Sequence, residues 1–573
     1  MGDRQNRNLG YGCGNGCGEE HGIDRRAFMK GTLALGAAGA LGLGLAACTN
    51  EEQGSGDDTA DEPENTTQNT TPARIDEVLE CDVAVVGCGV AGISACVRAT
   101  DLGARVIGMD RALSVAGTNA VSTVGFYGIA NKEELPIQYK QLTEKSNYML
   151  NITFLSRYLG IIEDLAANYL ARGMTIMTQT AYPTEENPGD FGVGSVIFTT
   201  GHFFVNREGD RAAEYEGLLE SCDGLDQMWR TEVTGLIVND GVISGCYAQD
   251  SDGRVYQINA KGGVIVCTGG FVHNAEMVSQ YIGNTTVYSY ANLFNDGAGI
   301  KLAQSTGAQL GKNFALNCSE GGGLNHKSRE FNTYLFGTNS ISRSPIIGDV
   351  ILNRRGQRFV DEGVMSKKTA MFCSEPLTRE GGAFYTVMSQ KEIDTLKTTT
   401  LFDYVLQRYG FAFTHPMILM FFAQDALPNI QEDAETAITE GWCWKADSFE
   451  ALEQVSGLAN LAATMQEYNG MCAAGVDTIL YKDEDFLVPY LEEDGPFYLV
   501  EHDFSAWSTQ GGIKTDAYCR ALDGDSQVIP GLYMAGMDAD NNMVPYLFGG
   551  TAQGFALGSG YLAAEDAVKR VLG

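Results

Sequence analysis

The sequence predicts an α/β fold built on a Rossmann-like domain, in which a parallel sheet carries a glycine-rich turn. Residues 82–86 form a short apolar run rich in β-branched side chains, the glycine-rich string 87–92 follows, and residues 93–102 have helical spacing. The chain has 573 residues, more than one hydrophobic core organises, and 70 of them are glycine. We therefore expect about two to four domains with many tight turns.

Each glycine of the turn has its own physical reason. Gly87 permits the tight turn, Gly89 lets the backbone approach a pyrophosphate, and Gly92 lets the helix pack close to the strand. A second apolar run, residues 105–109, ends at Asp110, which lies 23 positions after Gly87. A carboxylate at this place accepts hydrogen bonds from an adenosine ribose. The unit predicts a dinucleotide cradle, which FAD and NAD both use.

The chain is strongly acidic, because 39 Lys and Arg oppose 73 Asp and Glu and give a formal charge of −34 at pH 7. Such a surface repels nucleic acid and anionic lipid headgroups. We therefore expect no nucleic-acid partner, and we interpret the acidity as a solubility feature.

The 14 cysteines include no CxxC pair and no CxxCH string, so the sequence predicts no c-type haem. Cys81, Cys88 and Cys96 are close together, but their spacing matches neither a zinc site nor a ferredoxin. Thiols buried in a core are the favoured interpretation, with a bridging iron–sulfur cluster as the alternative. We predict no other metal site.

The first residues have the pattern of an export signal. Residues 24–30 contain a twin arginine, residues 31–47 are apolar and rich in small side chains, and Cys48 ends a lipobox. We expect a twin-arginine lipoprotein signal over 1–48 and a flexible acidic linker over 49–76. The mature protein is then extracytoplasmic and bound to the cell membrane only through its lipid anchor. Twin-arginine export carries folded proteins, commonly with a cofactor inserted, so a bound cofactor is expected.

Segments later in the chain distinguish between FAD and NAD as the bound dinucleotide. The relevant strings are an apolar strand running into a glycine turn at 260–271, then 511–516, 529–536 and 548–554. Together with the cradle, this layout resembles the FAD-dependent flavoprotein family of fumarate reductases and succinate dehydrogenases, which includes 3-ketosteroid dehydrogenases and cardiac glycoside reductases. The likeness runs from about residue 80 to the C-terminus.

The resemblance implies a discontinuous Rossmann-like FAD-binding domain, formed by residues 77–323 and 507–573, with an α+β capping domain inserted at 324–506. It also implies non-covalent FAD, because the Ser-His-Thr string that carries covalent FAD in the respiratory complexes is absent. Where the family usually has a Glu that helps to bind the ribityl chain, this chain has Met537, and Asp538 is the expected substitute. The residues implied to contact FAD are Gly87, Gly89, Gly92, Asp110, Thr118, Asn119, Gly269, Gly536, Asp538 and Gly549.

The positions that bind fumarate in the family are altered here. The proton-donating Arg aligns with Ser366, a carboxylate-binding His with Trp507 or Ser508, and a carboxylate-binding Arg with Leu547. Loss of charged donors forfeits hydrogen bonds about twice as strong as neutral ones. The sequence therefore disfavours a small dicarboxylate as substrate.

The string from Tyr546 to Gly550 is similar in spacing to one in 3-ketosteroid dehydrogenases, where the Tyr hydroxyl and the last Gly N–H polarise a substrate carbonyl. We expect these two residues to stabilise enolate charge, with a packed aromatic as the alternative for Tyr546. The candidate proton donors in the cap are Lys367, Lys368, Tyr334 and His415, for which a solvated lysine pair and a turn histidine are the ordinary alternatives.

The leading hypothesis is an exported FAD-dependent oxidoreductase, as in anaerobic respiration. It would reduce an activated C=C bond of an enone or unsaturated lactone or acid, in a neutral and steroid-like substrate rather than fumarate. Electrons would come from a separate membrane or periplasmic cytochrome. One alternative is a 3-ketosteroid-type flavin dehydrogenase, which forms the C=C bond. The alternative of another class is a catalytically inactive lipoprotein that binds flavin or a ligand.

Overall fold

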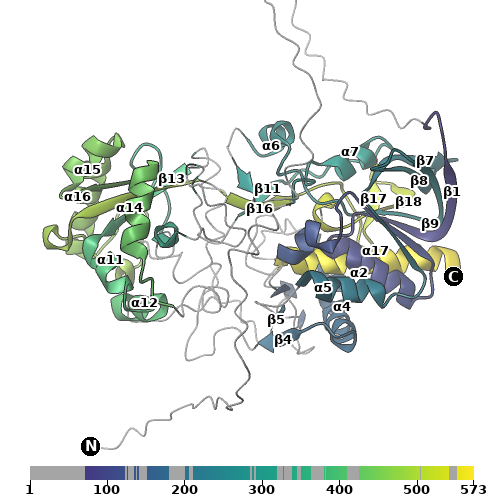
Figure 1. Cartoon of the computed structure of the whole chain (residues 1–573), viewed down its shortest axis with the longest axis horizontal. Helices are drawn as coiled ribbons and strands as arrows, with labels where there is room; N and C mark the ends of the chain where they lie inside the picture. Colours follow the sequence, from purple (N-terminus) through teal and green to yellow (C-terminus); the bar gives the residue numbers. More distant parts are fainter. Residues whose placement is uncertain are drawn as a thin grey trace, which may run out of the picture. The chain divides into compact units, whose positions relative to one another are not determined.

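The computed structural model describes residues 71–122, 125–126, 135–136, 139–140, 143, 151–179, 201–204, 211–283, 287–289, 292–318, 325, 327, 339–344, 350–362, 380, 383–409, 425–503, 505–540 and 551–573 (Figure 1). The chain divides into two units, Met1–Asn65 and Thr66–Gly573, and the described residues all belong to the second. The predicted export signal and most of the predicted linker lie outside them and stay predictions. No helix in this described part is long and apolar enough to cross a bilayer.

The largest sheet has eight strands, in the order β17-β18-β9-β1-β2-β6, with β8 pairing to β9 and β7 to β8. The strands are β1 (Glu77–Val86), β2 (Val106–Asp110), β6 (Leu225–Trp229), β7 (Thr231–Asn239), β8 (Val242–Asp250), β9 (Val255–Val266), β17 (Arg520–Leu522) and β18 (Val528–Met534). The five strands from β18 to β6 run parallel. Because β1 is central, the last six residues of this strand are all buried, as expected for an apolar run in a parallel sheet.

The two faces of this sheet pack against different cores. Val83 and Val85 share a core with α2 (Val90–Asp101), α4 (Ile152–Ala171), α5 (Arg211–Glu220) and α17 (Thr551–Leu572), whereas Ala84 and Val86 pack with β7, β8, α6 (Ala275–Tyr281) and α7 (Ala298–Gln304). Figure 1 shows α2 and α17 side by side. They approach closely because Gly560 has no Cβ, which would lie 2.0 Å from the Ala91 carbonyl oxygen.

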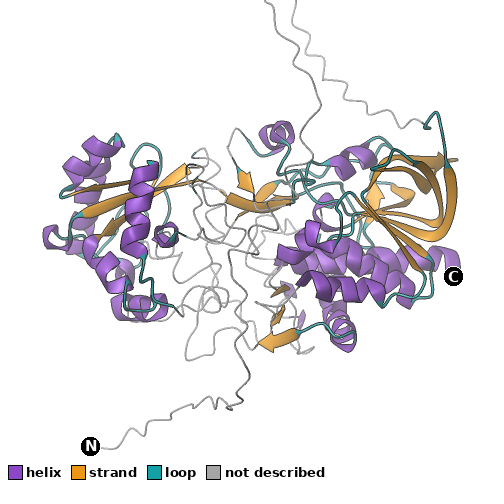
Figure 2. Cartoon of the chain, viewed as in Figure 1, coloured by secondary structure: helices purple, strands orange, loops and turns teal. Residues whose placement is uncertain are grey.

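A second, antiparallel sheet has the order β12-β13-β15-β14. Its strands are β12 (Ile351–Leu352), β13 (Ala383–Ser389), β14 (Cys443–Ala446) and β15 (Phe497–Asp503). Side chains of β15 alternate between two cores, one shared with α11 (Gln390–Leu396), α12 (Leu401–Tyr409) and α14 (Ile430–Glu440), the other with α15 (Phe449–Ser456) and α16 (Leu461–Ala474). Figure 2 shows these helices around the strands. This α+β body falls within the predicted cap, whose boundaries stay a prediction.

Two small sheets complete the described strands. One has the order β10-β16-β11, from Tyr288–Ser289, Ser505–Gln510 and Ala315–Cys318, and the other has the order β3-β5-β4, from Gly125–Phe126, Gly201–Phe204 and Ile176–Gln179. β16 follows β15 in the chain after one residue and pairs with strands from the first part of the chain.

Candidate cofactor and active site

The parallel strands of the large sheet end at one edge, and the predicted cradle lies there. Three backbone hydrogen bonds cross this edge from strand to strand: Gly87 N to Met109 O, Cys267 N to Val86 O, and Ala535 N to Val266 O. They join the ends of β2, β1, β9 and β18. In open parallel sheets, ligands bind outside the carboxyl ends of the strands.

The three glycines of the turn meet different surroundings. Gly87 has φ +97°, and a Cβ there would lie 2.4 Å from the Cys267 carbonyl oxygen. A Cβ on Gly92 would lie 1.8 Å from the Gly87 carbonyl oxygen. Gly89 differs, because a Cβ there would meet no atom of the described residues within 4 Å. Close packing thus explains Gly87 and Gly92, whereas the space beside Gly89 is open and its contact with the pyrophosphate stays a prediction.

Asp110 ends β2 and faces the turn. Its carboxylate accepts hydrogen bonds from Cys88 N at 2.6 Å and from Ala112 N at 2.7 Å. Burial raises the pKa of Asp110. Together with Gly87, Thr268 and Gly299, this residue lines a cavity of about 40 Å³ at the ends of β1, β2 and β9. The position is the one expected of a ribose-binding carboxylate, and its contact with FAD stays a prediction.

Asp538 holds the turn after β9. Its Oδ2 accepts hydrogen bonds from Thr268 N, from Thr268 Oγ1 at 3.0 Å, and from Gly269 N at 3.2 Å. The residue is fully buried, and its Oδ1 has no hydrogen-bond partner in the part of the chain that the structure describes. Burial raises the pKa of this carboxyl to about 7, and the nearby Asp296 adds to the shift. A buried carboxylate oxygen without a donor is costly, so this atom fits a ligand hydroxyl such as those of the ribityl chain.

Thr118 and Asn119 belong to a polar layer beside this turn. Asn119 Oδ1 accepts from Asn292 N at 2.6 Å, and Asn119 Nδ2 donates to Asn295 Oδ1 at 3.5 Å. A Cβ on Gly269 would lie 2.4 Å from the same Asn295 oxygen, which explains why a glycine stands there. Thr118 Oγ1 donates to Val115 O at 2.8 Å. The layer brings Asn119 and Gly269 together through Asn295, whereas the Thr118 hydroxyl closes its own turn.

Gly536 opens a short 3-10 helix, Gly536–Asp538, with φ +63°. Its N–H donates to Ser559 Oγ at 2.9 Å, which ties the end of β18 to α17. The glycine therefore has a structural reason in addition to its predicted contact with FAD.

Several predicted residues lie outside the described part of the chain. They are the carbonyl-polarising pair Tyr546 and Gly550, the candidate proton donors Lys367, Lys368, Tyr334 and His415, the cofactor residue Gly549, and the altered positions Ser366 and Leu547. Their roles stay predictions. Of the altered positions, Trp507 and Ser508 are described. Ser508 is buried and donates its hydroxyl to Thr509 O at 3.1 Å, and Trp507 packs against the core of α11, α12 and α14.

Four residues that shape the site carry no role predicted from the sequence. Thr268 carries two of the bonds to Asp538, and Asn295 links Gly269 to Asn119. Arg111 binds Asp296 through two hydrogen bonds of 2.9 and 3.0 Å, which fixes the loop before α7 to the end of β2. Thr268 stands in the 260–271 string, which carries part of the family resemblance. Only the hydrogen bonds of the folded chain show what the side chains of these four residues do.

The predicted cysteine trio divides between environments. Cys81 belongs to the core under β7 and β8, whereas Cys96 belongs to the core under α2 and α17. All three thiols are free and buried. A hydrogen bond with Cys96, together with burial, raises the pKa of Cys88. Among the described residues, no three His, Cys, Asp or Glu form a group that could hold a metal ion. The structure favours thiols that pack in cores.

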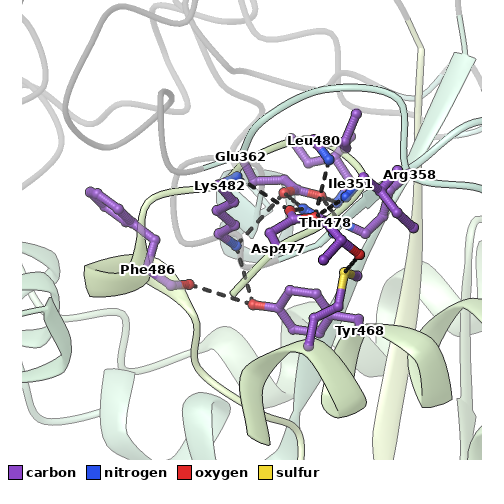
Figure 3. Close-up of polar contacts among 11 residues, drawn as sticks. Ile351, Arg358, Glu362, Tyr468, Asp477, Thr478, Leu480, Lys482 and Phe486 are labelled. Carbon is purple, nitrogen blue, oxygen red and sulfur yellow. Dashed lines mark hydrogen bonds and ion pairs between the residues drawn. The ribbon is translucent and has the colours of Figure 1, made fainter. Parts of the chain in front are cut away.

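A buried charged cluster lies in the α+β body, as Figure 3 shows. Arg358 donates to Glu362 at 2.7 and 2.8 Å and to Asp477 at 2.8 Å, and Lys482 lies 3.7 Å from Glu362 and donates to Tyr468 at 3.2 Å. Two cations therefore face two carboxylates without solvent. The cluster ties the loop after β12 to the loop after α16.

Comparison with known families identifies the cofactor. A family model described as "FAD binding domain" matches residues 204–554. The chain belongs to this FAD-binding family. A second model, described as "Alanine dehydrogenase/PNT, C-terminal domain", matches residues 60–134, which include β1, the glycine turn and β2.

Two curated relatives indicate the kind of enzyme, and one solved structure shows the fold. The chain is 26% identical to a vinyl phenol reductase of Lactiplantibacillus plantarum over 85% of this chain and 96% of that protein. It is 28% identical to a 3-oxosteroid 1-dehydrogenase of Mycolicibacterium smegmatis over 61% of this chain and 60% of that protein. The open conformation of a flavocytochrome c3 fumarate reductase superposes with a TM-score of 0.57 at 20% identity, covering 86% of this chain and 79% of that one, which shows the fold.

These findings confirm three predictions: the α/β fold with a Rossmann-like FAD-binding domain, FAD as cofactor, and an FAD-dependent oxidoreductase of the class that acts on CH–CH or C=C bonds. The described residues fit FAD, because Gly89 leaves space for a ligand and Asp538 offers a free acceptor. When bound, FAD supplies hydride transfer to or from a substrate carbon. The chain would hold it through the 87–92 turn, Asp110 and Asp538.

Proposed function

We propose that this oxidoreductase reduces an activated C=C bond beside a carbonyl, in a neutral and bulky substrate of the enone or unsaturated lactone type. The observation that carries the proposal is the neutral set of residues at the substrate-carboxylate positions. Ser508 gives its hydroxyl to its own strand, and Ser366 and Leu547 replace the two arginines of the family. Without cations, a desolvated pocket binds a dicarboxylate poorly.

The relatives support this substrate class. A vinyl phenol reductase aligns with nearly its whole length, and a 3-oxosteroid 1-dehydrogenase aligns with more than half of its own. Both names describe enzymes of compounds larger and less charged than fumarate.

The electron donor in this proposal is a separate membrane or periplasmic cytochrome. One structural relative is a flavocytochrome, whereas this sequence has no CxxCH string for attaching a c-type haem. The twin-arginine pattern and Cys48 support an extracytoplasmic, lipid-anchored location, where such carriers operate.

An anaerobic acceptor assay tests the proposal. The purified chain is reduced with a viologen dye and then offered fumarate, an α,β-unsaturated ketosteroid and a vinyl phenol, while reoxidation is followed by absorbance. We expect a neutral acceptor to reoxidise the flavin and fumarate to fail. Rapid turnover of fumarate contradicts the proposal. Flavin that no acceptor reoxidises favours the inactive binding lipoprotein.

Tyr546 provides a second test. If its hydroxyl polarises the substrate carbonyl, Tyr546→Phe lowers kcat about 100-fold, because one oxyanion donor contributes ~3 kcal/mol. FAD content and the visible spectrum serve as controls and should not change. A packed aromatic without this role predicts nearly unchanged kcat.

The second candidate is the reverse reaction, a 3-ketosteroid-type dehydrogenase. The similarity to a 3-oxosteroid 1-dehydrogenase favours it. The oxidised enzyme, supplied with a saturated 3-ketosteroid and an artificial electron acceptor, would then form the unsaturated product faster than the reduced enzyme consumes it.

A further inference from the structure

Gln510 is a buried amide without a hydrogen-bond partner. The residue has no solvent exposure, and neither its Oε1 nor its Nε2 has a hydrogen-bond partner among the described residues. Native proteins pair nearly all buried side-chain amides, because an unpaired one loses the bonds that it makes with water. An amide in which both atoms are unpaired therefore points to a group that the described part of the chain does not supply.

Residues on both sides of Gln510 contact the FAD cradle. The preceding residue, Thr509, accepts a hydrogen bond from Phe271 N at 2.9 Å, in the turn that follows β9. On the other side, a Cβ on Gly512 would lie 2.1 Å from the Asp538 carbonyl oxygen, and Ile513 N donates to that oxygen at 2.8 Å. Gln510 thus lies at the end of β16, and the residues before and after it contact the turn after β9 and the segment that contains Asp538.

We infer that the Gln510 carboxamide hydrogen-bonds the pyrimidine edge of the FAD isoalloxazine. This edge presents a carbonyl oxygen beside an N–H, which is the complement of an amide that offers one donor and one acceptor. A ketone or lactone carbonyl offers acceptors alone and would leave Oε1 unpaired. The two orphaned atoms therefore favour the flavin over the substrate. The inference rests on the FAD site and not on the substrate proposed above.

Such a contact sets the redox potential of the flavin. Reduction places electron density on the pyrimidine ring, so an N–H that donates to its carbonyl binds the reduced form more tightly than the oxidised form. Removal of the donor makes the midpoint potential more negative. A tenfold selective loss of binding to the reduced form corresponds to ~30 mV for a two-electron couple.

Three variants of the FAD-loaded, full-length enzyme test the inference. Gln510→Met keeps the approximate shape without polar atoms, and Gln510→Glu keeps an acceptor but replaces the donor by a negative charge. The control is Gln257→Met, because Gln257 lies in β9 and donates to Asn259 at 3.0 Å, away from the cradle. The readouts are the midpoint potential, the rate of FAD release on dilution, and KM for the acceptor.

We expect Gln510→Met to release FAD about tenfold faster and to have a more negative midpoint potential than the parent enzyme. Gln510→Glu should shift the potential further in the same direction, and Gln257→Met should change neither value. If both Gln510 variants keep the parental potential and release rate, the inference is wrong. It is equally overturned if only KM rises, because the amide then binds the substrate. If Gln510→Met does not fold, Gln510→Glu, which keeps the side-chain shape, decides.

Discussion

The three glycines of the turn are required for different reasons. Gly87 and Gly92 are required by the protein itself, since a Cβ on either would overlap a carbonyl oxygen. Gly89 faces open space and has φ −78°, which any residue adopts. The described residues therefore give no steric reason for a glycine here, as we expect if it serves the FAD pyrophosphate.

A pair of alanine variants separates these roles. We expect Gly89→Ala to fold with a stability within ~0.5 kcal/mol of the parent but to bind FAD at least ~10-fold more weakly, because its methyl group keeps the pyrophosphate away. Gly87→Ala should destabilise the chain itself by ~2 kcal/mol or more. Urea unfolding and FAD titration measure the two effects. Equal loss of stability in both variants would contradict this division.

Asp538 makes the FAD-free protein sensitive to pH. Burial raises its pKa to about 7, whereas an Asp in the unfolded chain titrates near ~4. The folded state therefore binds this proton more tightly, so the contribution of Asp538 to stability is greatest below about pH 4 and falls as the pH rises to about 7, by at most ~4 kcal/mol. We expect Asp538→Asn to remove most of this slope in urea unfolding between pH 5 and pH 8.

Asp540 also contributes to the pH dependence of stability and has to be separated from Asp538. Burial raises its pKa to about 6, so it adds a second slope of the same sign, which Asp538→Asn leaves in place. An unchanged total slope in Asp538→Asn would show that the Asp538 carboxyl does not titrate in this range.

At the scale of elements, the turn after β12 contains a buried arginine and an exposed arginine, each beside a carboxylate. Arg358 is almost fully buried between Glu362 and Asp477, whereas Arg355 is 61% exposed beside Glu380. Breaking a buried ion pair leaves an uncompensated charge, but a solvated pair contributes little.

We therefore expect Glu362→Gln to lower the free energy of unfolding by ~3 kcal/mol, and Arg355→Gln to change it by less than ~0.5 kcal/mol. Chemical unfolding of the α+β body, followed by the fluorescence of the buried Trp442, measures both. A small effect of Glu362→Gln would show that Lys482 and Arg358 find other partners.

The sequence predicted the strand–turn–helix unit well because its signals are local. The apolar run before Gly87 and the acid at Asp110 stand at spacings that the fold requires, and the structure places both at one sheet edge. The partners of Asp538 could not be predicted in this way. Thr268 lies 270 positions away, and only the pairing of β18 with β9 brings the two together. Gln510 could not be predicted either, because only the folded structure shows that its amide is buried without a partner among the described residues.

At the scale of the whole molecule, the start of the folded unit lies before β1. The division falls between Asn65 and Thr66, and Asp76 exchanges hydrogen bonds with Val255 at 2.8 and 2.9 Å. We expect a chain that begins at Thr66 to bind FAD with the parental stoichiometry and Tm. A chain that begins at Glu80 loses the first pairs of β1 with β9, and its Tm should fall by about 5 °C. Calorimetry and flavin absorbance compare the two, and equal Tm values would contradict the expectation.

The strand order also constrains when this protein can be completed during synthesis. β18 and α17, which lie against β9 and α2, come from the last 46 residues of the chain. The ribosome has therefore made the glycine turn and the whole α+β body before the sheet closes. A nascent chain cannot present the finished pocket to FAD, and a premature stop codon before residue 528 leaves β9 with an unpaired edge. Flavin capture must therefore follow the synthesis of β18 and α17.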